Sequence, residues 1–117
     1  MNVRVFAVLL AVGIPPVHAL DYRALQGEYA LGGKTLIDPP HEEARDSHLY
    51  LELSGTAAHE LYSALKTKAQ PDACGDPGDM RKRQGTLACT MSARVKDFHC
   101  TFGIELGTQR IVNAAAC

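Results

Sequence analysis

The chain has 117 residues, with 12 lysines and arginines against 13 aspartates and glutamates. This length makes one domain with a modest core, and the balanced charge excludes a general affinity for nucleic acid or anionic membranes. The four cysteines and five histidines show neither C-x-x-C nor H-x-x-x-H spacing, so the sequence predicts no metal site and no cofactor.

Residues 1–19 have the pattern of a secretory signal peptide. One early cation, Arg4, precedes an apolar run over residues 5–14, two prolines follow, and residues 17–19 fit the small-x-small cleavage rule. A membrane span needs about 18 apolar residues, which is more than this run offers. We expect cleavage near Ala19 and a soluble product in the periplasm or outside the cell, with no membrane anchor. The mature chain would carry eleven basic and thirteen acidic residues.

The first element of the mature chain is predicted to be a hairpin. Residues 28–31 and 34–37 are strand-like runs on either side of a glycine pair at 32–33, and Gly-Gly supplies the positive φ angles of a two-residue turn. This register would place Tyr29 opposite Leu36. The run before it, residues 21–26, reads either as a helical turn or as an ordered lead-in.

A polar connection over residues 41–47 follows two prolines and is expected to be exposed. Its neighbouring carboxylates, Glu42 and Glu43, could suggest acid–base chemistry. A solvated loop is the favoured interpretation, because nothing nearby in the sequence would desolvate either group.

Residues 48–54 alternate strictly between leucine and other side chains, which is typical of a strand with one solvated face. His48 and Tyr50 are expected on that solvated face. Residues 55–68 then repeat apolar side chains at helical spacing. We expect this helix to cover the leucine face of the sheet.

Two details of the predicted helix follow from its flanking residues. Ser54 or Thr56 is positioned to cap its first turn. His59 and Glu60 fall outside its apolar stripe and are expected at the surface.

Residues 70–85 are the least regular part of the chain and the candidate binding region, since loops on a rigid scaffold concentrate binding residues. Their aspartates lack the spacing of a calcium loop, and three adjacent cations are too few to predict nucleic-acid binding. A solvated turn is the simpler interpretation, and recognition of an acidic protein or anionic ligand is the sharper one. The candidate binding residues are Asp76, Asp79, Arg81, Lys82 and Arg83.

Residues 85–106 carry the strongest local prediction, a hairpin with one cysteine in each strand. Reversal around Arg94 and Val95 sets Cys89 opposite Cys100. Directly opposed Cα atoms of antiparallel strands lie about 4.5 to 5.5 Å apart, within the range of a disulfide.

The favoured disulfide pairing is therefore Cys89–Cys100 with Cys74–Cys117, among the three connectivities that four cysteines allow. Farther along the chain, residues 110–112 read as a short edge strand. No nucleophile elbow, phosphate-binding glycine loop or Cys–His pair is apparent, because His99 and Cys100 are strand neighbours that point to opposite faces. An enzyme is therefore disfavoured.

Three motifs complete the pattern after the leader: G-x-Y-x-L-G-G-K-T-L at Gly27–Leu36, the strand-to-helix run at 49–65, and the cysteine hairpin. Together they resemble a broad group of small exported bacterial proteins, mostly without an assigned function. These motifs are structural, so the resemblance implies no catalytic residues. Some compact periplasmic proteins of this size are similar to inhibitors or immunity proteins that block wall-degrading enzymes, a similarity of compartment and scale.

The sequence thus predicts a single α+β domain over residues 20–117, with a mainly antiparallel sheet of four or five strands, one helix packed on one face, and disulfides that stabilise it. The first hypothesis for its function is an exported periplasmic binding protein without catalytic activity, acting on a periplasmic protein as an inhibitor or immunity protein. The alternatives are a small periplasmic hydrolase built from tyrosine, histidine and carboxylate groups, and an envelope structural or stress protein. Oligomeric state is not predicted.

Overall fold

The computed structural model describes residues 12–16 and 19–117. Most of the predicted signal peptide, including residues 17 and 18 of its cleavage site, lies outside the described residues. The elements are β1 (Gly27–Gly32), β2 (His48–Ser54), α1 (Gly55–Ala64), β3 (Gln70–Pro71), β4 (Met80–Gln84), β5 (Leu87–Met91), β6 (Phe98–Glu105) and β7 (Arg110–Val112). The α+β class is confirmed, whereas the predicted strand number was wrong, because the sheet has seven strands.

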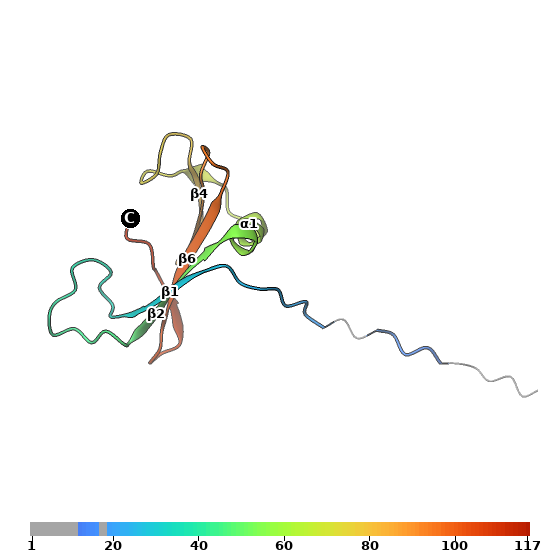
Figure 1. The fold of residues 1–117 in the computed structure, drawn as a ribbon, viewed down its shortest axis with the longest axis horizontal. Coiled ribbons are helices and arrows are strands. Elements are labelled where there is room, and N and C mark those ends of the chain that lie inside the picture. Colours follow the sequence, from blue (N-terminus) through green and yellow to red (C-terminus); the bar gives the residue numbers. More distant parts are fainter. Residues whose placement is uncertain (1–11, 17–18) are drawn as a thin grey trace, which may run out of the picture.

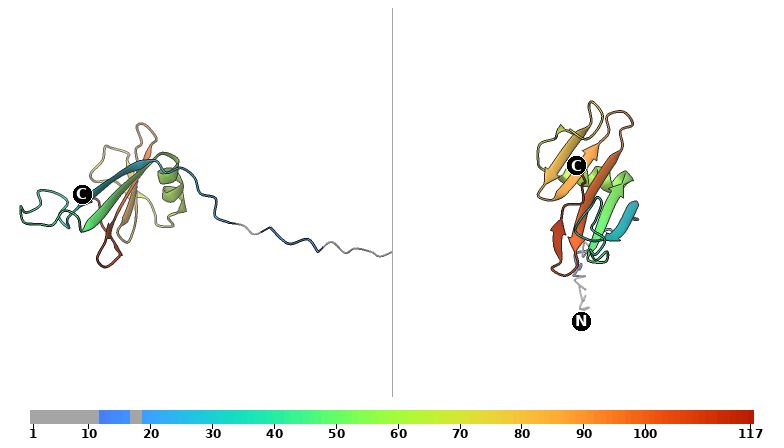
Figure 2. Two further views of the ribbon diagram at one scale, coloured as in Figure 1. Left: turned by 60° about the horizontal axis from the view of Figure 1, so that its bottom comes forward. Right: turned by 90° about the vertical axis from the view of Figure 1, so that its left-hand side faces the viewer.

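All the strand pairs are antiparallel and form one sheet in the order β1-β2-β6-β5-β4-β3 (Figure 2). The long strand β6 pairs with β5 over residues 98–101 and with β7 over residues 103–105. Two short strands therefore occupy successive parts of one side of β6. The strands β1 and β3 form the two ends of the row.

The predicted first hairpin was wrong, because β1 pairs with β2 and not with residues 34–37. The β1–β2 ladder extends over six residue pairs, which is longer than the predicted hairpin could provide. Residues 33–47 instead form a loop held by side chains. Tyr50 Oη donates to the carbonyl oxygen of Gly33 at 2.5 Å, and the Glu43 carboxylate accepts from Thr35 Oγ1 at 2.7 Å.

The same loop changes the environment of the polar face of β2. His48, expected to be solvated, is only 7% exposed, and its ring stacks on that of Tyr50 at a centroid distance of 5.8 Å. Tyr50 is half-buried. Both predictions of a solvated side chain were wrong, because residues 33–47 return to this end of the face and Tyr50 bonds to them.

The core lies between α1 and the cysteine hairpin. Cys89 and Cys100 are opposite each other, as predicted, and both are fully buried. Ala58 and Leu65 of the helix region pack against them. Helix α1 therefore packs on the face of the sheet that carries the leucines, as predicted, and covers the part around Leu53.

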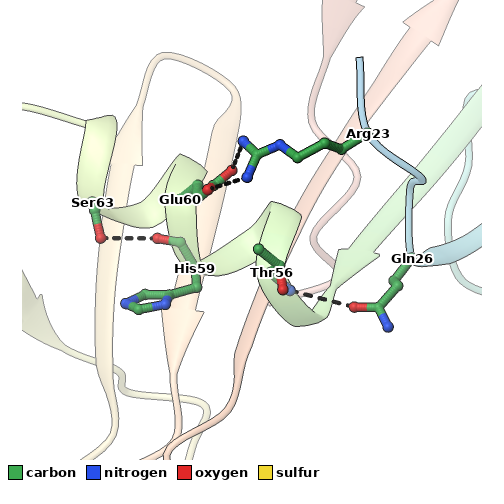
Figure 3. Close-up of polar contacts among 6 residues, drawn as sticks. All are labelled: Arg23, Gln26, Thr56, His59, Glu60 and Ser63. Carbon is green, nitrogen blue, oxygen red and sulfur yellow. Dashed lines mark hydrogen bonds and ion pairs between the residues drawn. The ribbon is translucent and has the colours of Figure 1, made fainter. Parts of the chain in front are cut away.

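The ends of α1 differ from the prediction. The helix ends at Ala64 and not at residue 68, because Leu65 is extended, with ψ 126°. Ser54 makes no side-chain cap. Instead Gln26, in the segment before β1, accepts a hydrogen bond from the Thr56 N–H at 3.3 Å (Figure 3).

The segment that enters β1 is bound to α1 by a second contact. Arg23 donates to both carboxylate oxygens of Glu60, at 2.7 and 2.6 Å (Figure 3). Hydrogen bonding to Glu60 and its charge raise the pKa of Arg23. His59, expected at the surface, is exposed and stacks on Phe98 at a centroid distance of 4.4 Å.

Both disulfides have the pairing that the sequence favoured. Cys89–Cys100 crosses the central hairpin with a Cα separation of 4.0 Å, and Cys74–Cys117 joins the loop before β4 to the C-terminal segment, with a Cα separation of 6.3 Å. Residues 113–117 and α1 lie on opposite sides of the sheet (Figure 1). The predicted edge strand at residues 110–112 is present as β7.

Candidate functional site

The candidate binding region at residues 70–85 is more regular than predicted, because it contains β3 and β4. The aspartate side chains of this region accept hydrogen bonds from the main chain of the loop between β3 and β4. Asp79 accepts hydrogen bonds from the N–H groups of Asp76 at 2.9 Å and Ala93 at 3.0 Å, and Asp72 accepts one from Cys74 N–H at 3.1 Å. Asp79 therefore joins two neighbouring loops, whereas the Asp76 side chain is exposed.

The predicted basic cluster is divided between the two faces of β4, because neighbouring strand residues point to opposite sides. Arg81 forms an ion pair with Asp72 at 3.2 Å and donates to the Cys117 carbonyl oxygen at 3.1 Å. Lys82 points to the other face, toward α1. Arg83 is exposed and has no ion pair with the described residues. The three cations therefore do not form one basic surface.

The polar face of the sheet has a hollow of about 500 Å³ beneath the C-terminal segment. Its lining includes Glu52, Arg81, Thr90, His99 and Thr101. The His99 ring lies between two carboxylates, with Nδ1 3.3 Å from Glu52 and Nε2 3.1 Å from Asp97. Nε2 hydrogen-bonds to Asp97, whereas Nδ1 is buried and makes no hydrogen bond with the described residues, although Glu52 lies 3.3 Å away.

Helix α1 covers only part of the opposite face of the sheet. A ten-residue helix is about 15 Å long and about 10 Å wide, whereas six strands in a row extend over about 24 Å. α1 packs around the Cys89–Cys100 disulfide and leaves the other end of this face open (Figure 1). By register and alternation, the apolar side chains there are Tyr29, Leu31, Leu49, Leu51, Phe102, Ile104 and Ile111.

We call these seven residues the open apolar face. Three of them are strongly exposed: Tyr29 by 75%, Leu31 by 58% and Ile111 by 59%. They come from β1 and β7, which flank the central part of the patch. Sequence reasoning missed this surface, because it paired Tyr29 with Leu36 and assigned one helix to the whole apolar face. The predicted lengths gave no signal of it, because a helix over residues 55–68 is long enough to cover a sheet of four or five strands.

The described residues show no helix long and apolar enough to cross a membrane. Within the same part of the chain, no three histidine, cysteine, aspartate or glutamate side chains are grouped so that they could hold a metal ion. Comparisons of the chain with known protein families, with curated proteins and with solved structures find no match.

Proposed function

We propose that this chain is an exported, periplasmic protein that binds a protein partner and does not catalyse a reaction. The open apolar face is the observation that carries this proposal. Contiguous exposed apolar patches on monomeric proteins mark interaction sites, since isolated exposed apolar residues are common but large groups of them are not. Here four strands contribute to one such patch.

The proposed compartment rests on the predicted leader and on the disulfides. Disulfides persist in oxidising compartments such as the bacterial periplasm, and the described residues contain two of them and no free cysteine. The sharpest form of the proposal is an inhibitor or immunity protein, which would cover a surface of a secreted or wall-degrading enzyme. A hydrolase is less favoured, because the sequence contains no nucleophile elbow and no Cys–His pair.

Site-specific photo-crosslinking in the periplasm of the native host tests this proposal. A photoreactive side chain at Ile111 or Leu31 should form an adduct with the same protein from both positions. The control position is Lys66, which is exposed, lies two residues after α1 and is outside the patch. No common adduct from the two patch positions, or an equal adduct from Lys66, would contradict the proposed binding surface.

Introducing a charge into the patch provides the matching affinity test. Ile111→Lys should weaken retention of the crosslinked partner by about tenfold or more, because a cation buried in an apolar contact must lose its hydration. The control Arg83→Glu changes an exposed residue on the other face of the sheet and should leave retention unchanged. Equal retention by all three forms would show that the patch is not the contact.

A further inference from the structure

We infer that the outer edge of β1 accepts an extended segment of the protein partner as an added strand, and that this segment alternates apolar with basic side chains. The inference rests on the proposed function and gives the binding mode and the chemistry of the partner. Strand addition uses main-chain hydrogen bonds for affinity and alternate side chains for specificity.

The edge of β1 offers free main-chain groups. β1 is at one end of the strand order, and β2 is its only neighbour among the described residues. Ser54 N–H donates to the Gln26 carbonyl oxygen at 3.0 Å, which fixes the direction of the peptide groups along β1. Because this direction alternates, the N–H and C=O groups of Tyr29 and Leu31 point away from β2.

Most of the features that block an exposed edge are missing from Gly27–Gly32, whose one charged side chain is Glu28. Natural edge strands are protected by proline, by charged side chains and lysine above all, by bulges or by a covering loop. The sequence of β1, GEYALG, contains neither proline nor lysine, and it pairs with β2 without interruption. In the described part of the chain, no backbone hydrogen bond reaches its outer side.

One side of an added strand would extend the open apolar face. Tyr29 and Leu31 point to that face and are 75% and 58% exposed. Residues of the added strand that lie opposite them point to the same face, since directly opposed residues share a side. Apolar side chains at these alternate positions would cover the exposed part of both residues.

The other side of β1 is acidic. Glu28 lies directly opposite Glu52 in the β1–β2 register, and like charges in this position repel each other. None of the ion pairs among the described residues includes Glu28. A hollow of about 160 Å³ beside the two carboxylates is also lined by Ala30, Tyr50 and Thr101. A basic side chain from the added strand, opposite Glu28 or Ala30, would reach this hollow and relieve the repulsion.

Charge complementarity favours this occupant over a second copy of the chain. Two antiparallel β1 strands that keep their apolar sides together place Glu28 opposite Gly32 or opposite Ala30 of the other copy. Neither register brings a cation to Glu28 and Glu52. A partner segment with lysine or arginine at alternate positions does.

The test uses the oxidised, isotope-labelled chain and two short synthetic peptides, one alternating valine with lysine and the other alternating valine with glutamate. At millimolar peptide concentrations, the lysine peptide should shift the NMR signals of β1 and slow hydrogen exchange at the Tyr29 and Leu31 amides. The glutamate peptide should do neither. Equal effects of both peptides, or protection confined to other segments, would overturn the inference.

Backbone and charge variants separate the two parts of the inference. Tyr29→Pro removes an outward N–H without removing a donor to β2, as edge strands tolerate, and it should abolish binding of the lysine peptide. Glu28→Gln should weaken that binding by about fivefold, whereas Glu42→Gln, the same charge change in an exposed loop, should not. Unchanged binding by Tyr29→Pro would exclude strand addition.

Two further outcomes have a definite meaning. Protected Tyr29 and Leu31 amides in the free chain, together with the mass of a dimer, would assign the edge to a second copy and overturn the inference. If Ile111 crosslinks a partner while the lysine peptide leaves β1 unaffected, the proposed function stands and strand addition fails. Peptide binding at β1 without any crosslinked partner would support the edge and contradict the proposed function.

Discussion

Lys82 on β4 closes the end of α1 and lies over Tyr62, with its ammonium 4.6 Å from the centre of that ring. The same ammonium donates to the carbonyl oxygens of Tyr62 at 3.1 Å and Leu65 at 3.2 Å. The final carbonyl groups of a helix lack partners within the helix, and a cation near them is favourable. A side chain that sequence reasoning assigned to ligand binding thus completes a structural contact.

Replacing Lys82 by methionine should lower the free energy of unfolding by about 2 kcal/mol, because it removes charge-assisted hydrogen bonds and a cation–π contact. Urea denaturation followed by circular dichroism measures this change. The neighbouring Arg83→Met is the control, since Arg83 is exposed, and it should leave stability nearly unchanged. Equal effects of the two substitutions would show that the Lys82 contacts contribute little.

Gly103 of β6 leaves room for the ring of Tyr50. A Cβ atom at this position would lie 2.8 Å from Tyr50 Cδ1 and 2.9 Å from Val112 Cγ2. Gly103→Ala should therefore destabilise the chain by about 1–3 kcal/mol, as overpacking does. Gly107→Ala, where nothing lies within 4 Å, should have little effect. Thermal denaturation of both variants decides the point, and an unchanged transition for Gly103→Ala would refute the steric argument.

Removal of each disulfide should increase hydrogen exchange in a different part of the chain. Replacing Cys74 and Cys117 by serine opens a closed segment with a sequence separation of 43, which corresponds to about 4 kcal/mol in the chain-entropy model. Hydrogen exchange should then increase in residues 113–117 but not in β5 and β6. Alanine at Cys89 and Cys100, which are fully buried, should instead increase exchange throughout the core. The same exchange pattern in both variants would contradict this division.

Acid should weaken the contact between Glu43 and Thr35 that helps to hold the loop at residues 33–47. Hydrogen bonding from Thr35 lowers the pKa of Glu43 below its usual value of 4.5. The folded chain therefore favours the ionised carboxylate, so this contribution to stability is complete above the unfolded pKa and is lost as the pH falls through the folded pKa. An NMR titration of the Glu43 carboxyl carbon should show a midpoint below 4.5.

Thr35→Val tests the cause of this pKa shift, because it removes the hydroxyl that donates to Glu43 at 2.7 Å. The midpoint should rise toward the usual value. Thr108→Val is the matched control, since that hydroxyl donates to Glu105. A Glu43 midpoint that moves equally in both variants would assign the shift to another source.

The sequence identified the elements whose pattern is local. Strict alternation located β2 within its observed bounds, and two cysteines at matching positions set the register of β5 and β6. The first hairpin failed because the turn preference of Gly32-Gly33 is a local signal. The contacts that decide this region, from Tyr50 to Gly33 and from Glu43 to Thr35, connect residues far apart in the chain or in opposite parts of the loop.

The candidate site was harder to predict for a related reason. A run of three cations looks solvated in the sequence, and β4 was therefore read as a loop. Only the fold shows that Lys82 turns toward carbonyl groups of α1 while Arg81 turns toward Asp72. The open apolar face depends on which part of the sheet α1 covers. Sequence periodicity predicts which residues are on the apolar face, but it does not predict where the helix lies on that face.

Both ends of α1 depend on side chains from distant segments, Gln26 at its start and Lys82 at its end. A ten-residue helix that begins with glycine has little stability in isolation. The helix should therefore form late in folding, after β4 has joined the cysteine hairpin. Substitutions in the β5–β6 hairpin should slow folding, whereas substitutions at Gln26 or Lys82 should mainly accelerate unfolding.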